Sequence, residues 1–333
     1  MTMPHIPVML PEVLEALAPR TGDIIADATL GAGGYSAAIL EAGARVIAFD
    51  RDPDAVAAAQ ERFAGQDRLT IVPRSFDSLE EEAAHHAPEG LDGAVFDLGV
   101  SSMQLDQSER GFSFMRDGPL DMRMGDGPTA ADVVNTLDQG DLKRVLWQYG
   151  EERRAEALAA AIVRQRQERP FETTGQLAAI AGAPRAKERI HPATRMFQAI
   201  RIFVNDELGQ LVRALIGAER SLKEDGRLVM VTFHSLEDRI VKRFLATAAG
   251  AEGGASRHRP MVESAPAGFE LLSRKAVAAS DKEASDNPRA RSAKLRAARR
   301  TGAPPTDWSQ DRLNALGAPA IVFSSLQQEW SVR

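Results

Sequence analysis

The 333-residue sequence contains no cysteine, and this absence excludes several kinds of chemistry at once. Disulfide frameworks, thiolate zinc sites, iron–sulfur clusters and cysteine nucleophiles all need a thiol. Only six histidines are available as alternative ligands, so we predict no metal site. A chain of this length buries roughly 75% of the surface that its unfolded form exposes, and it therefore needs no cross-link in order to fold.

Long apolar runs are also missing. No stretch of 18 apolar residues occurs, and the first six residues lack a basic segment followed by an apolar one. The sequence therefore predicts neither a transmembrane helix nor a secretory signal, and we expect no membrane partner. The cytoplasm is the expected location.

The sequence also has no excess of basic residues, and its formal net charge is −6. Proteins that bind nucleic acid over their whole surface are usually basic, so a nucleic-acid partner would have to bind a local patch. The densest patch lies in residues 287–300, with six basic residues and no acidic one. We expect Arg289, Arg291 and Lys294 to contact phosphates there. The alternative interpretation is a solvated helix face, which is the usual origin of a charge run.

Short apolar segments alternate with helical segments near both ends of the sequence. Strands are expected at residues 23–28, 45–49, 69–72, 92–96 and 228–233. This alternation is typical of an α/β fold, in which helices cover both faces of a parallel sheet.

Between residues 104 and 195 no strand is predicted, and about ninety mainly helical residues interrupt the α/β pattern. The sequence is therefore expected to form three parts. They are a discontinuous α/β domain of residues 1–104 and 196–300, an inserted helical domain of residues 105–195, and a tail of unknown role, residues 301–333.

A glycine-rich loop, Gly31-Ala32-Gly33-Gly34, stands between the first predicted strand and the next helix. Glycines allow positive φ angles and close approach of a ligand, and the following helix points free N–H groups at the same place. Asp50 comes 19 residues after Gly31, at the end of the second strand, where a carboxylate can accept hydrogen bonds from ribose hydroxyls. We expect a nucleoside-containing cofactor at this edge of the sheet.

Two residues favour S-adenosylmethionine over a dinucleotide as that cofactor. Ser36 occupies the third glycine position of the dinucleotide fingerprint. Asp27, just before the loop, would repel a pyrophosphate but would attract a sulfonium or an amino group. No Gly-Lys-Ser/Thr follows, which excludes a phosphate-binding P-loop. An NAD-dependent oxidoreductase stays the alternative, and a binding assay with both cofactors would separate the two.

The other strand ends carry further candidates. Phe76 follows the third strand and is placed either against an adenine ring or in the core. Asp97 ends the fourth strand and should face the cofactor. Gln104 follows in the loop, where a substrate would reach the methyl group of the cofactor. His234 follows the fifth strand, either as a proton acceptor or as the neighbour of the next helix.

Longer motifs resemble those of one known family. The matching stretches include Asp27 to Gly34, Phe49 to Pro53, Asp97 to Ser102, Arg110 to Phe114, Pro119 to Met124, Phe197 to Ile202, Phe233 to Arg239 and Asn287 to Arg289. With them the chain is similar, from His5 to about Arg300, to the bacterial ribosomal small-subunit RNA (cytosine-N4)-methyltransferase H family, also called MraW.

The resemblance implies a fold, a cofactor and a substrate. The fold is a Rossmann-like S-adenosylmethionine-dependent methyltransferase sheet with an inserted helical domain. The implied reaction methylates the N4 amino group of a cytosine (cytosine 1402) in the decoding region of 16S ribosomal RNA, with the 30S subunit as partner. A non-catalytic RNA-binding factor on the same fold stays an alternative, against which the intact glycine loop and Asp50 argue.

Carried over residue by residue, the resemblance assigns cofactor binding to seven positions. They are Gly33, Gly34, Tyr35, Asp50, Phe76, Asp97 and Gln104. Tyr35 departs from the family, which commonly has histidine there. The catalytic residues stay unassigned, because the stretch Asp97 to Val100 lacks the proline pair of many DNA amino-methyltransferases. Ser101, Ser102, Asp97 and His234 are the candidates for accepting the N4 proton.

Overall fold

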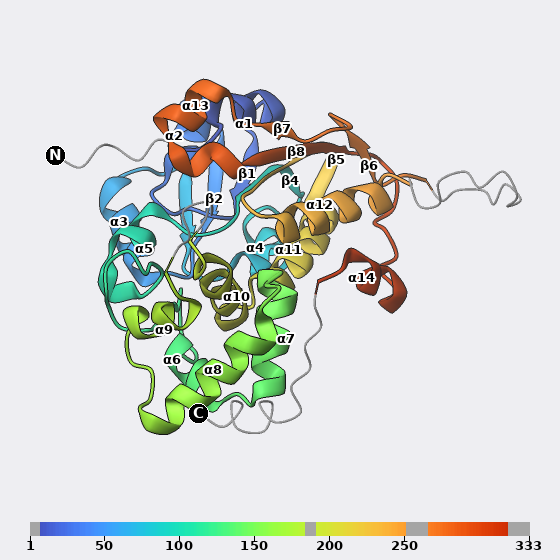
Figure 1. Ribbon diagram of the computed structural model, residues 1–333. Helices are drawn as coiled ribbons and strands as arrows, with labels where there is room; N and C mark the ends of the chain where they lie inside the picture. The colour runs from blue at the N-terminus through green and yellow to red at the C-terminus, as the bar shows by residue number, and fades with distance from the viewer. Residues whose placement is uncertain (1–6, 184–190, 251–265, 319–333) are drawn as a thin grey trace, which may run out of the picture. The chain divides into compact units, whose positions relative to one another are not determined.

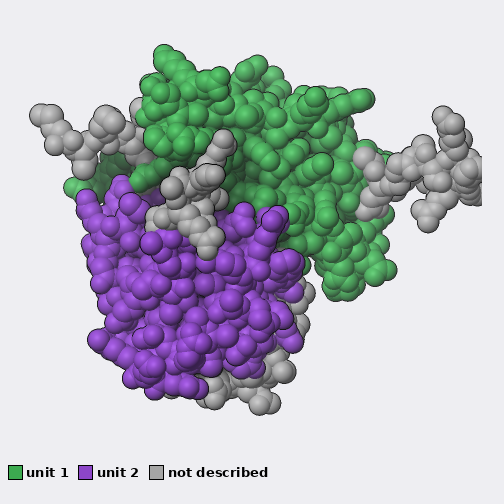
Figure 2. Space-filling view, viewed as in Figure 1, with its two compact units in different colours: residues 1–99, 208–318 green, residues 100–207, 319–333 purple. Residues whose placement is uncertain are grey.

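The computed structural model describes residues 7–183, 191–250 and 266–318 (Figure 1). The chain forms two compact units, residues 1–99 with 208–318 and residues 100–207 with 319–333 (Figure 2). The first division precedes the predicted boundary at residue 104, and the second follows the predicted boundary at residue 195. Helix α10 (Thr194–Val204) therefore belongs to the helical unit.

The first unit is built on a sheet that has eight strands among the described residues, in the order β3-β2-β1-β4-β5-β8-β6 with β7 beside β8. The strands are β1 (Ile24–Asp27), β2 (Arg45–Phe49), β3 (Leu69–Val72), β4 (Leu91–Asp97), β5 (Leu222–Thr232), β6 (Phe269–Leu271), β7 (Val277–Ala278) and β8 (Lys294–Arg300). The first five pair in parallel, and β8 pairs antiparallel with β5. This arrangement confirms the predicted α/β class with a Rossmann-like, mostly parallel sheet.

Helices cover the sheet of the first unit. They are α1 (Leu10–Leu17), α2 (Gly34–Glu41), α3 (Pro53–Arg62), α4 (Leu79–His86), α11 (Glu207–Ser221), α12 (Ser235–Ala248), α13 (Asp281–Asp286) and α14 (Gln310–Leu316), with 3-10 turns η1 (Phe76–Ser78) and η3 (Pro288–Ser292). In β5, Val229 and Val231 share a core cluster with Val13 of α1. Leu228 and Met230, which alternate with these valines along the strand, are also fully buried. Strands buried on both faces have continuous apolar runs, which is why the sequence pattern identified them.

The structure corrects two expectations about the first unit. The strand expected at residues 228–233 is longer, because β5 begins at Leu222, directly after α11, and ends at Thr232. Residues 294–300 form strand β8, so the interpretation of this basic segment as a solvated helix face is wrong. Leu295 and Ala297 face the core cluster, and β8 is held between β5 on one side and β6 and β7 on the other.

The second unit is helical, as the sequence predicted. Its elements are α5 (Ser102–Asp106), η2 (Ser108–Arg110), α6 (Ala130–Thr136), α7 (Gln139–Gly150), α8 (Ala155–Glu168), α9 (Thr174–Ala181) and α10. Its described residues contain no strand, only an isolated bridge between Pro119 and Thr173. Leu142, Val145 and Leu146 form the fully buried face of α7, at the spacing of an amphipathic helix. No helix in the described part of the chain is long and apolar enough to cross a membrane.

Candidate functional site

The candidate site of the first unit lies along one edge of the sheet, where the parallel strands end. The order β3-β2-β1-β4 places Phe76, Asp50, Asp27 and Asp97 in a row after their strands. Ligands of open α/β sheets bind outside this edge. The structure therefore brings together the predicted cofactor residues that belong to the first unit.

Two glycines of the loop, Gly33 and Gly34, leave no room for a side chain. Gly33 has φ +75°, and a Cβ there would lie 2.5 Å from the ring of Phe63. A Cβ on Gly34 would lie 2.1 Å from Cγ of Pro7. Gly33 is also the N-cap of α2 and supplies no side-chain cap, so the backbone of the loop and of the first helical turn lines the sheet edge.

Asp27 stabilises the glycine loop through hydrogen bonds on either side of it in sequence. Its carboxyl is fully buried and accepts hydrogen bonds from the Ser36 hydroxyl at 2.6 Å and from the Thr29 N–H at 3.2 Å. Burial raises the pKa of Asp27 to about 6, and the hydrogen bond from Ser36 opposes that rise. The expectation that Asp27 faces the ligand is therefore replaced by a supporting role. Ser36, noted in the sequence only as a missing glycine, joins the end of β1 to α2.

Asp97 differs from Asp27 because one of its carboxyl oxygens has no hydrogen-bond partner among the described residues. Its Oδ1 is buried and makes no hydrogen bond with the described residues, while its N–H donates to Thr29 Oγ1 at 2.6 Å. Burial raises the pKa of Asp97 well above its ordinary value, and the neighbouring Asp27 and Glu237 raise it further. A buried, unpaired carboxyl oxygen among other carboxyls is suited to a cationic donor such as an ammonium group.

Asp50 connects the second strand to the glycine loop. Its Oδ2 accepts from the Gly31 N–H and its Oδ1 from the Asp52 N–H, each at 2.9 Å. Burial raises the pKa of Asp50. Each carboxylate oxygen can accept a second hydrogen bond, so Asp50 can fix the loop and still accept from a ribose hydroxyl. The 19-residue spacing thus located a residue in direct contact with the loop.

The aromatic candidates are fixed by different contacts. Phe76 packs edge to face against Phe96, with ring centroids 5.9 Å apart, and its contact with an adenine stays a prediction. The buried Tyr35 donates a hydrogen bond from its hydroxyl to the Val8 carbonyl. The sequence did not predict this side-chain contact, because it joins residues that no local pattern relates.

The predicted residues Gln104 and Ser101 lie in the second unit. Ser101 is the N-cap of α5, and its hydroxyl accepts from the Gln104 N–H at 3.2 Å. Gln104 Oε1 accepts in return from the Ser101 N–H at 3.0 Å. These hydrogen bonds form a capping box that fixes the start of α5. Cofactor binding by Gln104 stays a prediction.

His234 is the N-cap of α12, as the simpler of its two interpretations expected. Its Nδ1 accepts from the Glu237 N–H at 3.4 Å, and Glu237 Oε2 accepts from the Phe233 and His234 N–H groups. Glu237 is almost completely buried and lies near Asp97. His234 therefore has a structural task whether or not it also accepts a proton.

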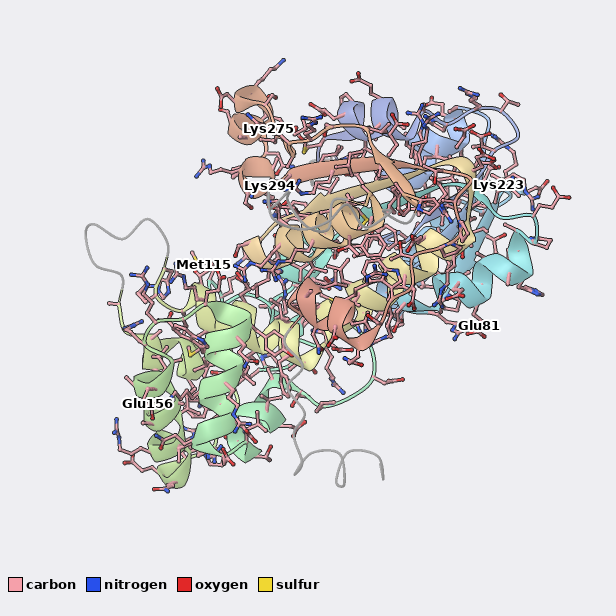
Figure 3. All side chains as sticks on the ribbon, turned by 90° about the vertical axis from the view of Figure 1, so that its right-hand side faces the viewer. Glu81, Met115, Glu156, Lys223, Lys275 and Lys294 are labelled. Atoms are coloured by element: carbon pink, nitrogen blue, oxygen red, sulfur yellow. The ribbon has the colours of Figure 1, made fainter. Side chains whose placement is uncertain are left out.

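The basic residues of segment 287–300 make different contacts. Lys294 and Arg296 both bind Asp238, at 3.0 and 2.7 Å (Lys294 is labelled in Figure 3). Arg299 pairs with Asp225 and Glu270, and the buried Arg300 donates only to backbone carbonyls. Arg289 and Arg291 lie exposed on η3. Phosphate binding by Arg289, Arg291 and Lys294 stays a prediction.

Comparison with known proteins gives consistent matches over most of the chain. A family model described as the MraW methylase family matches residues 2–301. The Ribosomal RNA small subunit methyltransferase H of Caulobacter vibrioides is 56% identical over 309 residues, covering 90% of this chain and 97% of that protein. The protein of the same name from Agrobacterium fabrum is 57% identical, covering 90% and 88%. Among solved structures, an rRNA methylase from Streptococcus thermophilus covers 88% of this chain and 93% of its own, with 12% identity and a TM-score of 0.40.

Proposed function

Since the chain belongs to the MraW methylase family, we propose that it methylates the N4 amino group of cytosine 1402 in the decoding region of 16S ribosomal RNA. The methyl donor is S-adenosylmethionine. The names and identities of the curated relatives support a small-subunit RNA substrate, and the motifs that resemble the cytosine-N4 methyltransferases support the target atom. We further propose the 30S subunit as the partner and the cytoplasm as the location.

The observation that carries the proposal is the pair of carboxyls at neighbouring strand ends. Both oxygens of Asp27 accept hydrogen bonds within the protein, whereas Asp97 Oδ1 has no partner among the described residues. The donor supplies a methyl group made electrophilic by a sulfonium, and it also carries an amino group. Asp97 would accept from that amino group, and Asp50 from the ribose. A carboxyl at the position of Asp97 suits an amino group better than the pyrophosphate of a dinucleotide, which favours methyl transfer over hydride transfer.

Cytosine N4 is a weak nucleophile, because its lone pair is delocalised into the ring. Holding N4 in line with the methyl group supplies much of the rate by positioning. A hydrogen-bond acceptor on the N4 hydrogens would localise the lone pair and take the proton that N4 loses when the N–C bond forms. Ser101, Ser102, Asp97 and His234 stay the candidates, and Ser101 and His234 each also cap a helix.

Methyl transfer to purified 30S subunits tests the proposal. Subunits from cells that lack this modification should gain one methyl group per particle, and mass spectrometry of nuclease digests should place it on N4 of one cytosine. The Asp97→Asn protein is the control for contaminating activity. Methylation elsewhere would overturn the proposed target. Folded protein that binds 30S subunits and S-adenosylmethionine but transfers no methyl group would favour the non-catalytic alternative.

A further inference from the structure

Residues 107–129 of the second unit form a long irregular segment that is nevertheless held rigidly. The Met122 N–H donates to the Arg110 carbonyl at 3.0 Å, and Arg110 Nη2 donates to the Arg123 carbonyl at 3.1 Å. Asn205 of the same unit accepts from the Met124 N–H at 2.9 Å and donates to the Met122 carbonyl at 2.7 Å. Two parts of the segment therefore cross each other and are fixed to the end of α10.

The tip of this segment is anchored on both sides. Before it, Phe112 is buried and Phe114 packs on Phe197, with ring centroids 4.9 Å apart. After it, Asp117 Oδ1 accepts from the Gly175 N–H at 2.7 Å. Between these anchors the Met115 side chain is 81% exposed (Figure 3). The fold thus holds a large apolar side chain in water on a short, fixed tip.

The tip also carries a cation, Arg116. Its side chain is exposed and makes no ion pair or hydrogen bond with the described residues. The neighbouring Asp117 accepts hydrogen bonds from the start of α9, and these hydrogen bonds lower its pKa. Met115 and Arg116 therefore present an apolar group beside a cation, which suits a polyanion with stacked apolar bases.

We propose that Met115 and Arg116 of the second unit bind the substrate RNA. Met115 would insert against a base that has lost its stacking partner, and Arg116 would bind an adjacent phosphate. This inference rests on the proposed function, because an enzyme that methylates a base needs RNA whose bases can be unstacked. An apolar wedge on a rigid tip lowers the cost of unstacking, as Met and Leu side chains do in proteins that kink nucleic acids.

The second unit offers matched controls for both residues. Trp147 on α7 is another exposed large apolar side chain, at 59%, and Arg164 on α8 is another exposed arginine. Met115→Ala should lower kcat/KM for 30S subunits about tenfold, whereas Met115→Leu should keep most of it and Trp147→Ala should change it less than about twofold. Arg116→Ala should reduce the salt slope of 30S binding by about one, and Arg164→Ala should leave it unchanged. Affinity for S-adenosylmethionine should stay the same in all five variants.

The outcomes separate this inference from the proposed function. If wild-type protein methylates 30S subunits and Met115→Ala behaves like Trp147→Ala, the wedge is wrong and the function stands. If wild-type protein does not methylate, the function fails, and equal 30S affinity of wild type and both tip variants overturns the RNA contact as well. A change only in self-association, measured by sedimentation, would mean that a second copy covers the tip and would also overturn the inference.

Discussion

Two carboxyls buried in the same unit, Glu219 of α11 and Asp97 of β4, differ in what surrounds them. Glu219 Oε1 accepts from the Thr306 N–H at 3.0 Å and from its hydroxyl at 2.7 Å, and Oε2 accepts from the Trp308 indole N–H at 2.7 Å. Asp97 Oδ1 accepts nothing from the described residues. A buried charge that the protein satisfies stabilises the fold, whereas one that it leaves unsatisfied is available to a ligand.

Glu219 also gives part of the predicted tail a role. The family match ends at residue 301, yet Thr306 and Trp308 fasten the following segment to α11. Trp308 stacks on Phe244 of α12, with ring centroids 4.8 Å apart. The described part of residues 301–333 therefore fixes itself to the first unit by hydrogen bonds to Glu219, whereas the sequence assigned the tail no role.

Replacing Glu219 should have the largest effect on stability. Glu219→Ala removes three hydrogen bonds to a buried carboxylate and leaves their three donor groups unsatisfied, so we expect a loss of about 3–5 kcal/mol of unfolding free energy. Urea denaturation measures it. Trp308→Phe removes the indole N–H and one of the two fused rings but keeps an aromatic ring beside Phe244, and it should cost less than Glu219→Ala, about 1–2 kcal/mol. Affinity for S-adenosylmethionine should not change, and a change in it would remove the distinction between the two carboxyls.

Asp27 should make stability depend on pH. Its pKa is raised to about 6 in the folded state from 3.8, so the folded protein keeps a proton that the unfolded chain loses. The contribution of Asp27 to stability is therefore greatest below pH 4, falls by about 3 kcal/mol as the pH rises from about 4 to 6, and changes no further above that. Asp27→Asn removes this contribution, so the stability of the variant relative to wild type should rise across this range. A constant difference would show that Asp27 does not titrate there.

Asp97→Asn should lower cofactor affinity without destabilising the fold. Loss of a charge-assisted hydrogen bond to the amino group of S-adenosylmethionine should cost about 1.5–3 kcal/mol, or tenfold to more than a hundredfold in Kd by calorimetry. Because burial and nearby carboxyls disfavour the Asp97 charge, the neutral variant should be at least as stable as wild type at pH 7. Unchanged affinity in a folded variant would mean that Asp97 is not the amino-group ligand.

The sheet illustrates which features sequence reasoning can reach. Residues 45–49 and 69–72 were predicted as strands with the bounds that the structure has, because an apolar run between helices has few other interpretations. Strand β8 was missed because four of its seven residues are basic. Their partners Asp225, Asp238 and Glu270 lie far away in sequence, so nothing local indicates that the charges are compensated.

The candidate site shows the same limit at the scale of single side chains. Asp50 could be located because its distance from the glycine loop follows from the length of one strand–helix–strand repeat. The contact of Tyr35 with Val8 and the hydrogen bond from the Met9 N–H to Glu283 could not, since they join remote segments. Spacing therefore predicts which strand end carries a polar group. The tertiary fold decides whether the oxygens of that group accept hydrogen bonds within the protein, as both do in Asp27, or whether one has no partner among the described residues, as in Asp97.

The smallest expected effect extends the comparison from carboxyls to the basic segment 287–300. Arg289 and Arg291 lie exposed on η3, and the ammonium of Lys294 on β8 binds Asp238 at 3.0 Å. Replacing both arginines with Ala should flatten the salt dependence of 30S binding by about one to two units of slope, because each phosphate contact contributes about 0.9. Lys294→Ala should change the slope by less than half a unit, because RNA would have to displace Asp238 before a phosphate binds this ammonium. A larger effect from Lys294 than from the two arginines would show that RNA does displace Asp238.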